Sequence, residues 1–219
     1  MWNSEIINML EQGVIDTLYM TLVSTFMGYV IGLPMGIVLA ITHKQGIKPN
    51  KFVYKLLDFI VNVVRSVPFL ILLIVLIPFT KLIVGKSYGS TATIVPLVIA
   101  AAPFIARLVE SSIQEVDKGV IEAAESMGAG TFTIIWKVLL VEARTSLLVG
   151  VTIATGTILG YSAMAGSIGG GGLGDLAIRY GYQRFRGDIM LTTVIILVVL
   201  VQGIQMLGDK IAHKLYHHN

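Results

Sequence analysis

The sequence predicts an all-α protein that crosses a lipid bilayer several times, and two observations lead to this prediction. Hydrophobic residues make up 55% of the 219 residues, while charged residues make up only 13%, and the mean hydropathy is +0.82. The apolar residues form runs long enough to span a bilayer, which requires about 20 residues of helix. We therefore expect one membrane domain over residues 1–219, with its start retained because no Lys or Arg precedes the first apolar run.

Five apolar runs, separated by polar connectors, predict five transmembrane helices. Their approximate positions are residues 14–41, 56–84, 91–109, 146–165 and 189–207. The first run is longer than a bilayer requires, so we expect this helix to be tilted or to extend beyond the membrane.

Small residues recur at every fourth position of the first run. They are Ser24, Gly28, Gly32, Gly36 and Ala40. Such a ridge lets a second helix approach closely. Close packing matters in a membrane because lipid tails are as apolar as large side chains, so apolar contact alone does not hold two helices together. We favour packing within one subunit over a seam between two subunits, and we expect Pro34 to kink the helix.

Polar residues on one face mark the start of the second run. Asp58, Asn62 and Arg65 are spaced at i, i+4 and i+7, which places them on one side of a helix. A charged Arg within a span costs roughly 2.5 to 3.5 kcal/mol and usually turns to a partner or a watery cavity. We expect Asp58 to be the partner of Arg65. The group is either a polar lining near the inner mouth of a pathway or a structural ion pair.

The fourth run is rich in small and hydroxyl-bearing residues, so few of its faces suit lipid. We expect it to be the innermost helix, after a third run kinked by Pro96 and Pro103. Near its far end Tyr161, Ser162 and Met164 are candidates for a gate or a substrate contact. Close helix packing is the alternative interpretation for each of them.

The outer connector after the fourth run is rich in glycine and then in aromatic and basic residues. We expect a flexible turn over residues 166–174, followed by a patch over residues 175–188 that suits lipid headgroups or an external partner. After the fifth run, His213 and His217 are spaced at i, i+4. We interpret them as solvated residues of the terminus and expect no metal site.

The distribution of Lys and Arg predicts the orientation. With five spans the termini lie on opposite sides, and one side carries ten of the sixteen Lys and Arg residues, the other five, with Arg65 inside a span. Cytoplasmic loops are enriched in Lys and Arg. We therefore expect the N-terminus outside, the C-terminus inside, and residues 117–130 in the cytoplasm.

The longest polar interruption, residues 117–128, predicts a short cytoplasmic helix. Asp117 is a candidate N-cap, and Gly128 can adopt the positive φ that ends a helix. The apolar residues Val120, Ile121, Ala124 and Met127 share one face. A helix of this length is not stable alone, so we expect a partner to cover that face.

These residues resemble a loop of bacterial ABC importer permeases. The sequence Glu122-Ala123-Ala124, with Gly128 and Val138-Leu139-Leu140 downstream, is similar to the family's E-A-A…G…I-x-L-P loop, although Val141 stands where the family has proline. Segments 65–69, 102–107, 160–164 and 171–174 extend the resemblance, and point to the methionine-type permeases of this family.

The resemblance implies a type I importer architecture in the bacterial inner membrane. It implies a homodimer that moves methionine by alternating access, two cytoplasmic ATP-binding subunits that hold ATP and Mg, and an extracytoplasmic substrate-binding lipoprotein. This chain would then bind no cofactor and would not be an enzyme. The implied ATPase-coupling residues are Glu122, Ala123, Ala124 and Gly128, and the candidate pathway residues are Arg65, Tyr161, Ser162 and Met164.

Other functions fit the sequence less well. The alternative is the same type of permease for another small amino acid or a related solute. An intramembrane serine protease would need a histidine near Ser162, whereas all four histidines lie at or beyond the ends of the spans. Nucleic acid is not expected as a partner, because no basic face with interleaved aromatic residues occurs. Membrane lipid surrounds the chain.

Overall fold

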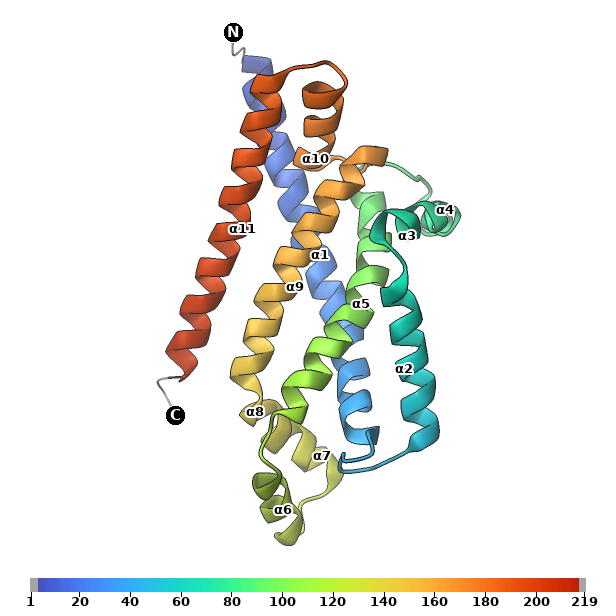
Figure 1. Ribbon diagram of the computed structural model, residues 1–219, viewed down its shortest axis with the longest axis vertical. Helices are drawn as coiled ribbons and strands as arrows, with labels where there is room; N and C mark the ends of the chain where they lie inside the picture. Colours follow the sequence, from blue (N-terminus) through green and yellow to red (C-terminus); the bar gives the residue numbers. More distant parts are fainter. Residues whose placement is uncertain (1–3, 217–219) are drawn as a thin grey trace.

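The computed structural model describes residues 4–216, and this part of the chain is helical without any strand (Figure 1). The prediction of an all-α protein is confirmed. The elements are α1 (Ser4–Thr42), α2 (Lys51–Ser66), α3 (Phe69–Val75), α4 (Ile77–Val84), α5 (Ser90–Gln114), α6 (Lys118–Ser126), α7 (Thr131–Ile134), the π-helix η1 (Ile135–Leu139), α8 (Leu140–Glu142), α9 (Arg144–Ala165), the 3-10 helix η2 (Gly166–Ile168), α10 (Gly172–Leu176), the π-helix η3 (Ala177–Tyr182) and α11 (Gly187–Tyr216).

Four helical stretches in the described residues are long and apolar enough to cross a membrane. They are α1, α5, the stretch Arg144–Tyr182 and Gly187–Lys214, and a fifth is obtained if the bent pair α2 and α3 is counted as one span. The count of five therefore stays a prediction. The first helix has 39 residues, as the length of its apolar run led us to expect.

The segment predicted as a span over residues 56–84 is not one continuous helix, whereas its role as a span stays a prediction. The axes of α2 and α3 differ by 100°. Pro68 explains the break, because its ring excludes the helical conformation of the preceding residue, and Val67 is extended with φ −84° and ψ 124°. The helix also begins earlier than expected, because the Asn50 side chain accepts hydrogen bonds from the amides of Phe52 and Val53, each at 3.1 Å.

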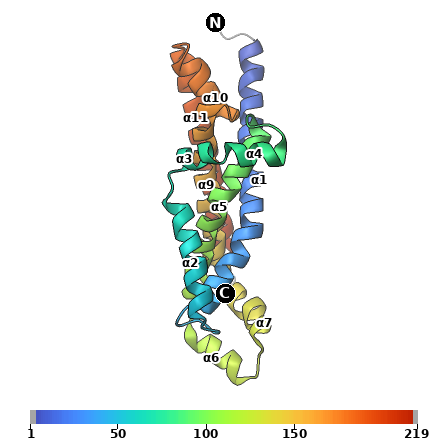
Figure 2. The ribbon, with the colours of Figure 1, turned by 90° about the vertical axis from the view of Figure 1, so that its right-hand side faces the viewer.

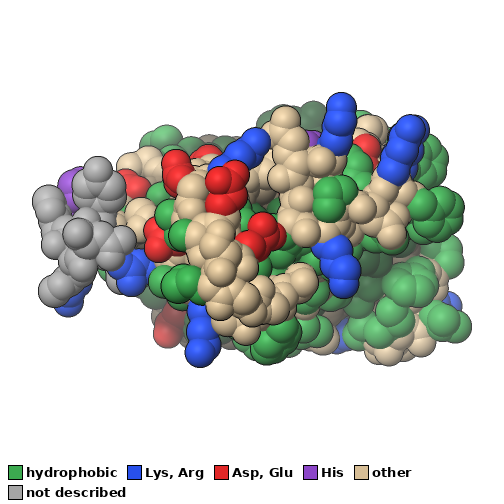
Figure 3. Space-filling model, turned by 90° about the horizontal axis from the view of Figure 1, so that it is seen from below, with side chains coloured by type: hydrophobic (Ala, Val, Ile, Leu, Met, Phe, Trp, Pro, Cys, Tyr) green, Lys and Arg blue, Asp and Glu red, His purple; other side chains and the backbone are tan. Residues whose placement is uncertain are grey.

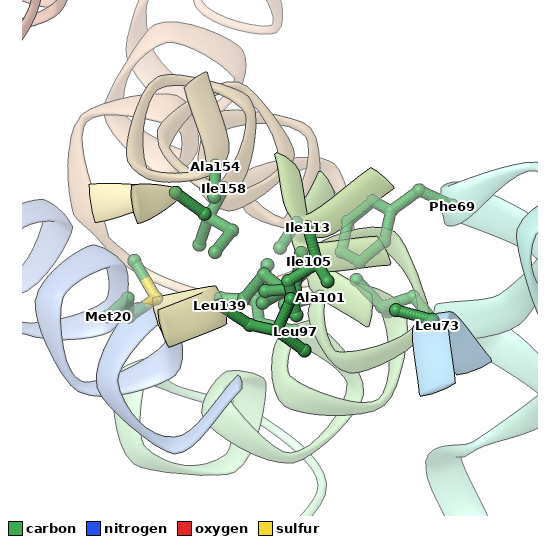
Figure 4. Packing of buried hydrophobic residues seen from close by; sticks show 14 of the residues in the cluster. Met20, Phe69, Leu73, Leu97, Ala101, Ile105, Ile113, Leu139, Ala154 and Ile158 are labelled. Carbon is green, nitrogen blue, oxygen red and sulfur yellow. The ribbon is translucent and has the colours of Figure 1, made fainter. Parts of the chain in front are cut away.

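The centre of the molecule is α5, which packs against α1, α2, α3, α4 and α9. The fourth run was expected to be innermost, and this expectation is wrong for the single chain: 56% of the most apolar stretch of α5 is buried, against 33% for the stretch that contains α9. Side chains from α5, including Leu97, Ala101 and Ile105, form the middle of the main apolar cluster (Figure 4). One face of α9 is open in the single chain, because Gly156 and Gly160 have free space where a Cβ atom would lie.

The small-residue ridge of α1 lies directly against α5, which confirms the prediction of packing within one subunit. A Cβ atom at Gly32 would lie 2.6 Å from the Ala102 carbonyl oxygen, and one at Gly36 would lie 2.6 Å from the Ala106 carbonyl oxygen. Only glycine allows the two backbones to approach so closely. The pair of helices forms the most extensive contact between elements of the described chain.

The glycine-rich turn over residues 166–174 is packed, which corrects the expectation of a flexible turn. Gly172, Leu173 and Gly174 are buried, and the Leu173 amide donates a hydrogen bond of 2.9 Å to the Thr17 hydroxyl of α1. The chain then turns back through α10 and η3, which lie beside α11 and the first part of α1 (Figure 1). The patch expected over residues 175–188 is therefore largely helical.

The two ends of the bundle differ. The short elements α6 and α7 project from one end, where α11 also finishes, and α1 begins at the opposite end (Figures 1 and 2). The connector between α1 and α2 lies at the same end as α6 (Figure 1). Which end faces the cytoplasm stays a prediction from the distribution of Lys and Arg.

Candidate functional site

The projecting helix α6 begins at a side-chain cap. The Asp117 carboxylate accepts a hydrogen bond of 2.7 Å from the Gly119 amide, and Asp117 itself is extended, with φ −61° and ψ 131°. A capped start satisfies backbone amides that would otherwise lack partners. The N-cap predicted from the sequence is confirmed.

The end of α6 is fixed by Gly128. The Gly128 amide donates to the Glu125 carbonyl at 2.9 Å, and the Ala129 amide donates to the Ala124 carbonyl at 3.1 Å. These two bonds, with φ +79° at Gly128, form a Schellman motif. The predicted stop is confirmed, and the chain leaves α6 in one defined direction toward α7.

The two sides of α6 face different surroundings. Ala124 is 5% exposed and packs in the main apolar cluster with Ile121 beside it, whereas Glu122 and Ala123 are exposed. The apolar face expected from the sequence is only partly covered, because Met127 is 82% exposed. The surface left open on α6 therefore combines a carboxylate, a small side chain and an apolar side chain.

The base of α6 is tied to α5 and α9 on one side and to the connector after α1 on the other. Residues 115–117 join it directly to α5, and the Ser146 hydroxyl, in the first turn of α9, lies 2.9 Å from the Glu115 carboxylate and 2.9 Å from the Ser112 hydroxyl of α5. On the other side, the Lys118 ammonium donates to the Gln45 side-chain oxygen at 3.2 Å. A displacement of α6 would therefore pull on α5 and α9 together.

A hollow of about 340 Å³ lies between α6 and the connector that follows α1. Its apolar side chains include Ile47 and Ile121, and its polar ones include His43, Lys118 and Glu122. Figure 3 views the molecule from this end and shows acidic and basic side chains gathered over it. The surface around α6 thus carries charges of both signs.

The helix after α6 is not broken at Val141, which agrees with the absence of the family's proline there. Val141 lies within α8, and the break comes two residues later at Ala143, whose ψ is −2°. The chain then enters α9.

The candidate pathway residues do not converge on one site in the described chain. Tyr161 stacks on Phe69 of α3 with ring centroids 4.5 Å apart, and Met164 is 48% exposed. Ser162 is buried and its hydroxyl donates to the Leu159 carbonyl at 2.7 Å, within its own helix. Arg65 is exposed at the end of α2. Their role as a pathway lining stays a prediction.

The expected pairing of Asp58 with Arg65 is wrong, because Asp58 pairs with Arg107 of α5. Arg107 also donates to the Glu110 carboxylate at 2.6 Å and to the Asn62 side-chain oxygen at 2.9 Å. The sequence places Arg107 and Glu110 one helical turn apart, but it carries no signal for a partner on another helix. Reasoning from the sequence therefore missed that Arg107 is the partner of Asp58.

The histidine pair considered for a metal cannot be assessed as a pair, since His217 lies outside the described residues. Within residues 4–216, no group of three or more His, Cys, Asp or Glu side chains is arranged to hold a metal ion.

Comparison with known proteins gives a consistent relationship over nearly the whole chain. The family described as binding-protein-dependent transport system inner membrane component matches residues 32–209. The probable D-methionine transport system permease protein MetI of Vibrio cholerae serotype O1 is 51% identical over 202 residues, which cover 92% of this chain and 90% of that protein. The methionine import system permease protein MetP of Bacillus subtilis is 47% identical over 175 residues, covering 80% of this chain and 79% of the relative.

Solved structures show the same relationship. A chain of the MetNI methionine ABC transporter in an inward facing conformation has a TM-score of 0.96 and 46% identity, with 98% of this chain and 99% of that chain covered. An amino acid ABC transporter shares the fold, with a TM-score of 0.79 at 22% identity. The chain therefore belongs to the family of binding-protein-dependent transport system inner membrane components.

Proposed function

We propose that this chain is the permease subunit of an ATP-driven methionine importer in the bacterial inner membrane. Two copies form the substrate path, two cytoplasmic ATPase subunits that hold ATP and Mg drive it, and an extracytoplasmic lipoprotein delivers the substrate. The names of the curated relatives support methionine as the substrate. Another small amino acid is the alternative.

The observation that carries this proposal is the exposed surface of α6. Glu122 and Ala123 are exposed on a helix that is capped at both ends, projects from the bundle and continues directly from α5. Small alanine allows a partner to approach closely, and the carboxylate can accept charge-assisted hydrogen bonds. ATP binding to the partner would bias the permease between two conformations through this contact.

The outer end of the molecule offers a surface for the binding lipoprotein. The Tyr180 ring lies 4.5 Å from the Arg184 guanidinium and 5.7 Å from that of Arg179, and Phe185 beside them is 90% exposed. Exposed aromatic and arginine side chains are enriched at protein interfaces. This end lies opposite α6, as delivery from outside requires (Figure 1).

The open face of α9 supports a second copy of the chain. A Cβ atom at Gly156 or Gly160 would meet no atom within 4 Å, and Met164 on the same helix is exposed. Small residues without a neighbour in the single chain suit either a close helix from a second copy or a wide path between two copies.

Reconstitution of the permease with its ATPase and binding lipoprotein tests the proposal. We expect uptake of labelled methionine into proteoliposomes that requires ATP and the lipoprotein, and we expect excess unlabelled methionine to compete better than leucine, alanine or histidine. A permease without the ATPase serves as the control and should give no accumulation. Uptake that persists without ATP would identify a channel, and stronger competition by another amino acid would contradict methionine as the substrate.

A further inference from the structure

A charged cluster joins α2 to α5 in the half of the bundle nearer to α6. Arg107 of α5 pairs with Asp58 of α2 and with Glu110 of its own helix, and it also donates to Asn62 of α2. The side chains of Arg107 and Glu110 are only 21% and 6% exposed. Charged side chains with so little exposure are costly unless they are paired.

The cluster adds charged contacts to a small apolar attachment of α2 to the rest of the molecule. Val61 is the only buried residue of α2, and it packs in a small cluster with Leu39 and Ala106. Apolar contact between helices gains little in lipid, because lipid tails are equally apolar. Asp58 and Asn62 lie on either side of Val61 in the sequence, so the hydrogen bonds of Arg107 reinforce the point at which α2 touches α5.

α2 lies between α5, which leads into α6, and the break at Pro68, and the proposed function requires these two parts to move together. Its partner α5 leads directly into α6, whereas its own last turn leads into the break at Pro68. Beyond the break, α3 is anchored in the core by Phe69, which stacks on Tyr161 of α9. α5 also contacts α3 and α4 directly, but a displacement of α5 reaches the near side of the Pro68 break only if α2 follows α5.

We propose that Asp58, Arg107 and Glu110 form a clasp that makes α2 and α5 one moving body. When α6 is displaced, α5 moves with it, Arg107 carries α2 along, and the movement is taken up at Pro68. Arg107 is thus a positioning residue, which acts through α2. This inference rests on the proposed function, because it assigns the clasp a role in coupling ATP hydrolysis to uptake.

Removing the three charges together tests the clasp. The variant Asp58→Asn/Arg107→Gln/Glu110→Gln keeps similar shapes and leaves no unpaired charge behind. In the reconstituted transporter we expect methionine uptake per ATP hydrolysed to fall about tenfold, while ATP hydrolysis and assembly change by less than about twofold. Lys55→Gln, which removes an exposed cation from the same helix, and Asp58→Glu, which keeps the charge, should both retain coupling. Coupling in the triple variant equal to that of the wild type would overturn the proposal.

Replacing the charged contacts by a covalent link tests whether coupling requires α2 and α5 to move together. In the variant Asp58→Cys/Arg107→Cys/Glu110→Gln, a short bifunctional thiol reagent can bridge α2 and α5, since the natural chain has no cysteine. We expect low coupling before bridging and recovery afterwards. This variant also serves if the triple variant fails to assemble.

Three outcomes of the bridging experiment decide the matter. Recovery of coupling after bridging supports the clasp. Bridging that blocks uptake would show that α2 and α5 must separate during transport. Coupling that stays low after bridging would show that the charges do not act by making α2 and α5 move together. Either of the last two results overturns the proposal. A wild-type complex without ATP-driven uptake would instead count against the proposed function.

Discussion

Replacement of Gly128 with valine is expected to uncouple ATP hydrolysis from uptake while the protein still inserts and assembles. Gly128 has φ +79° and a Cβ atom there would meet nothing within 4 Å, so the cost arises only in the backbone. An L-residue in this conformation costs roughly 1 to 2 kcal/mol, and β-branching makes valine worse. The Schellman motif would open and α6 would lose its fixed direction. We expect uptake per ATP to fall about tenfold, which corresponds to ~1.4 kcal/mol of coupling free energy.

Two controls separate this effect from general backbone strain. Gly85 has φ +80° after α4 and also has open space around it, so Gly85→Val imposes the same strain far from α6 and should leave coupling intact. Asparagine tolerates the left-handed conformation, so Gly128→Asn should be close to the wild type. The measurement is uptake and ATP hydrolysis in the same proteoliposomes at matched protein content. Normal coupling in Gly128→Val would refute the role assigned to this glycine.

Introducing a side chain at Gly36 is expected to prevent the permease from folding. A Cβ atom there would lie 2.6 Å from the Ala106 carbonyl oxygen and 2.6 Å from the Val109 Cβ atom. The carbonyl belongs to the backbone of α5 and cannot turn aside, so α1 and α5 would have to separate. We expect Gly36→Val to cost ~3 kcal/mol or more, at the upper end of the range for overpacking. The readout is the amount of monodisperse protein in detergent and its thermal unfolding midpoint.

A glycine in a free position provides the matched control. Gly203 lies in α11, and a Cβ atom there would meet nothing within 4 Å. Gly203→Val should therefore express and unfold like the wild type. Equal stability of Gly36→Val and Gly203→Val would contradict the close approach of α1 and α5.

The parts of the fold that follow from local patterns could be predicted from the sequence. The small-residue ridge of α1 identified a face for close packing, and Asp117 and Gly128 identified the ends of α6, because caps depend on a few neighbouring residues. The break at Pro68 was missed, since residues 69–84 are as apolar as a continued span would be. Hydropathy records how apolar a segment is and not the direction in which it runs.

The sequence predicted the residues of the candidate site that depend on local patterns, but not the contacts between distant helices. Glu122 and Ala123 were expected at an exposed contact surface, and the structure leaves them exposed. The partner of Asp58 was assigned to the same helix, whereas the structure places Arg107 of α5 there. Helical spacing identifies which residues share a face, but the helix that meets this face is decided by the packing of the whole bundle. The packing of the glycine-rich turn against Thr17 was missed because its contacts span most of the chain.

If α6 lies on the cytoplasmic side and receives the ATPase, site-directed labelling of its exposed face will show both. A single cysteine introduced by Glu122→Cys is unique, because the natural chain has none. With a membrane-impermeant maleimide, we predict no labelling in intact spheroplasts, labelling in inverted vesicles stripped of the ATPase, and protection when purified ATPase is added back. Labelling in intact spheroplasts, or labelling of inverted vesicles that the ATPase does not diminish, would contradict the account.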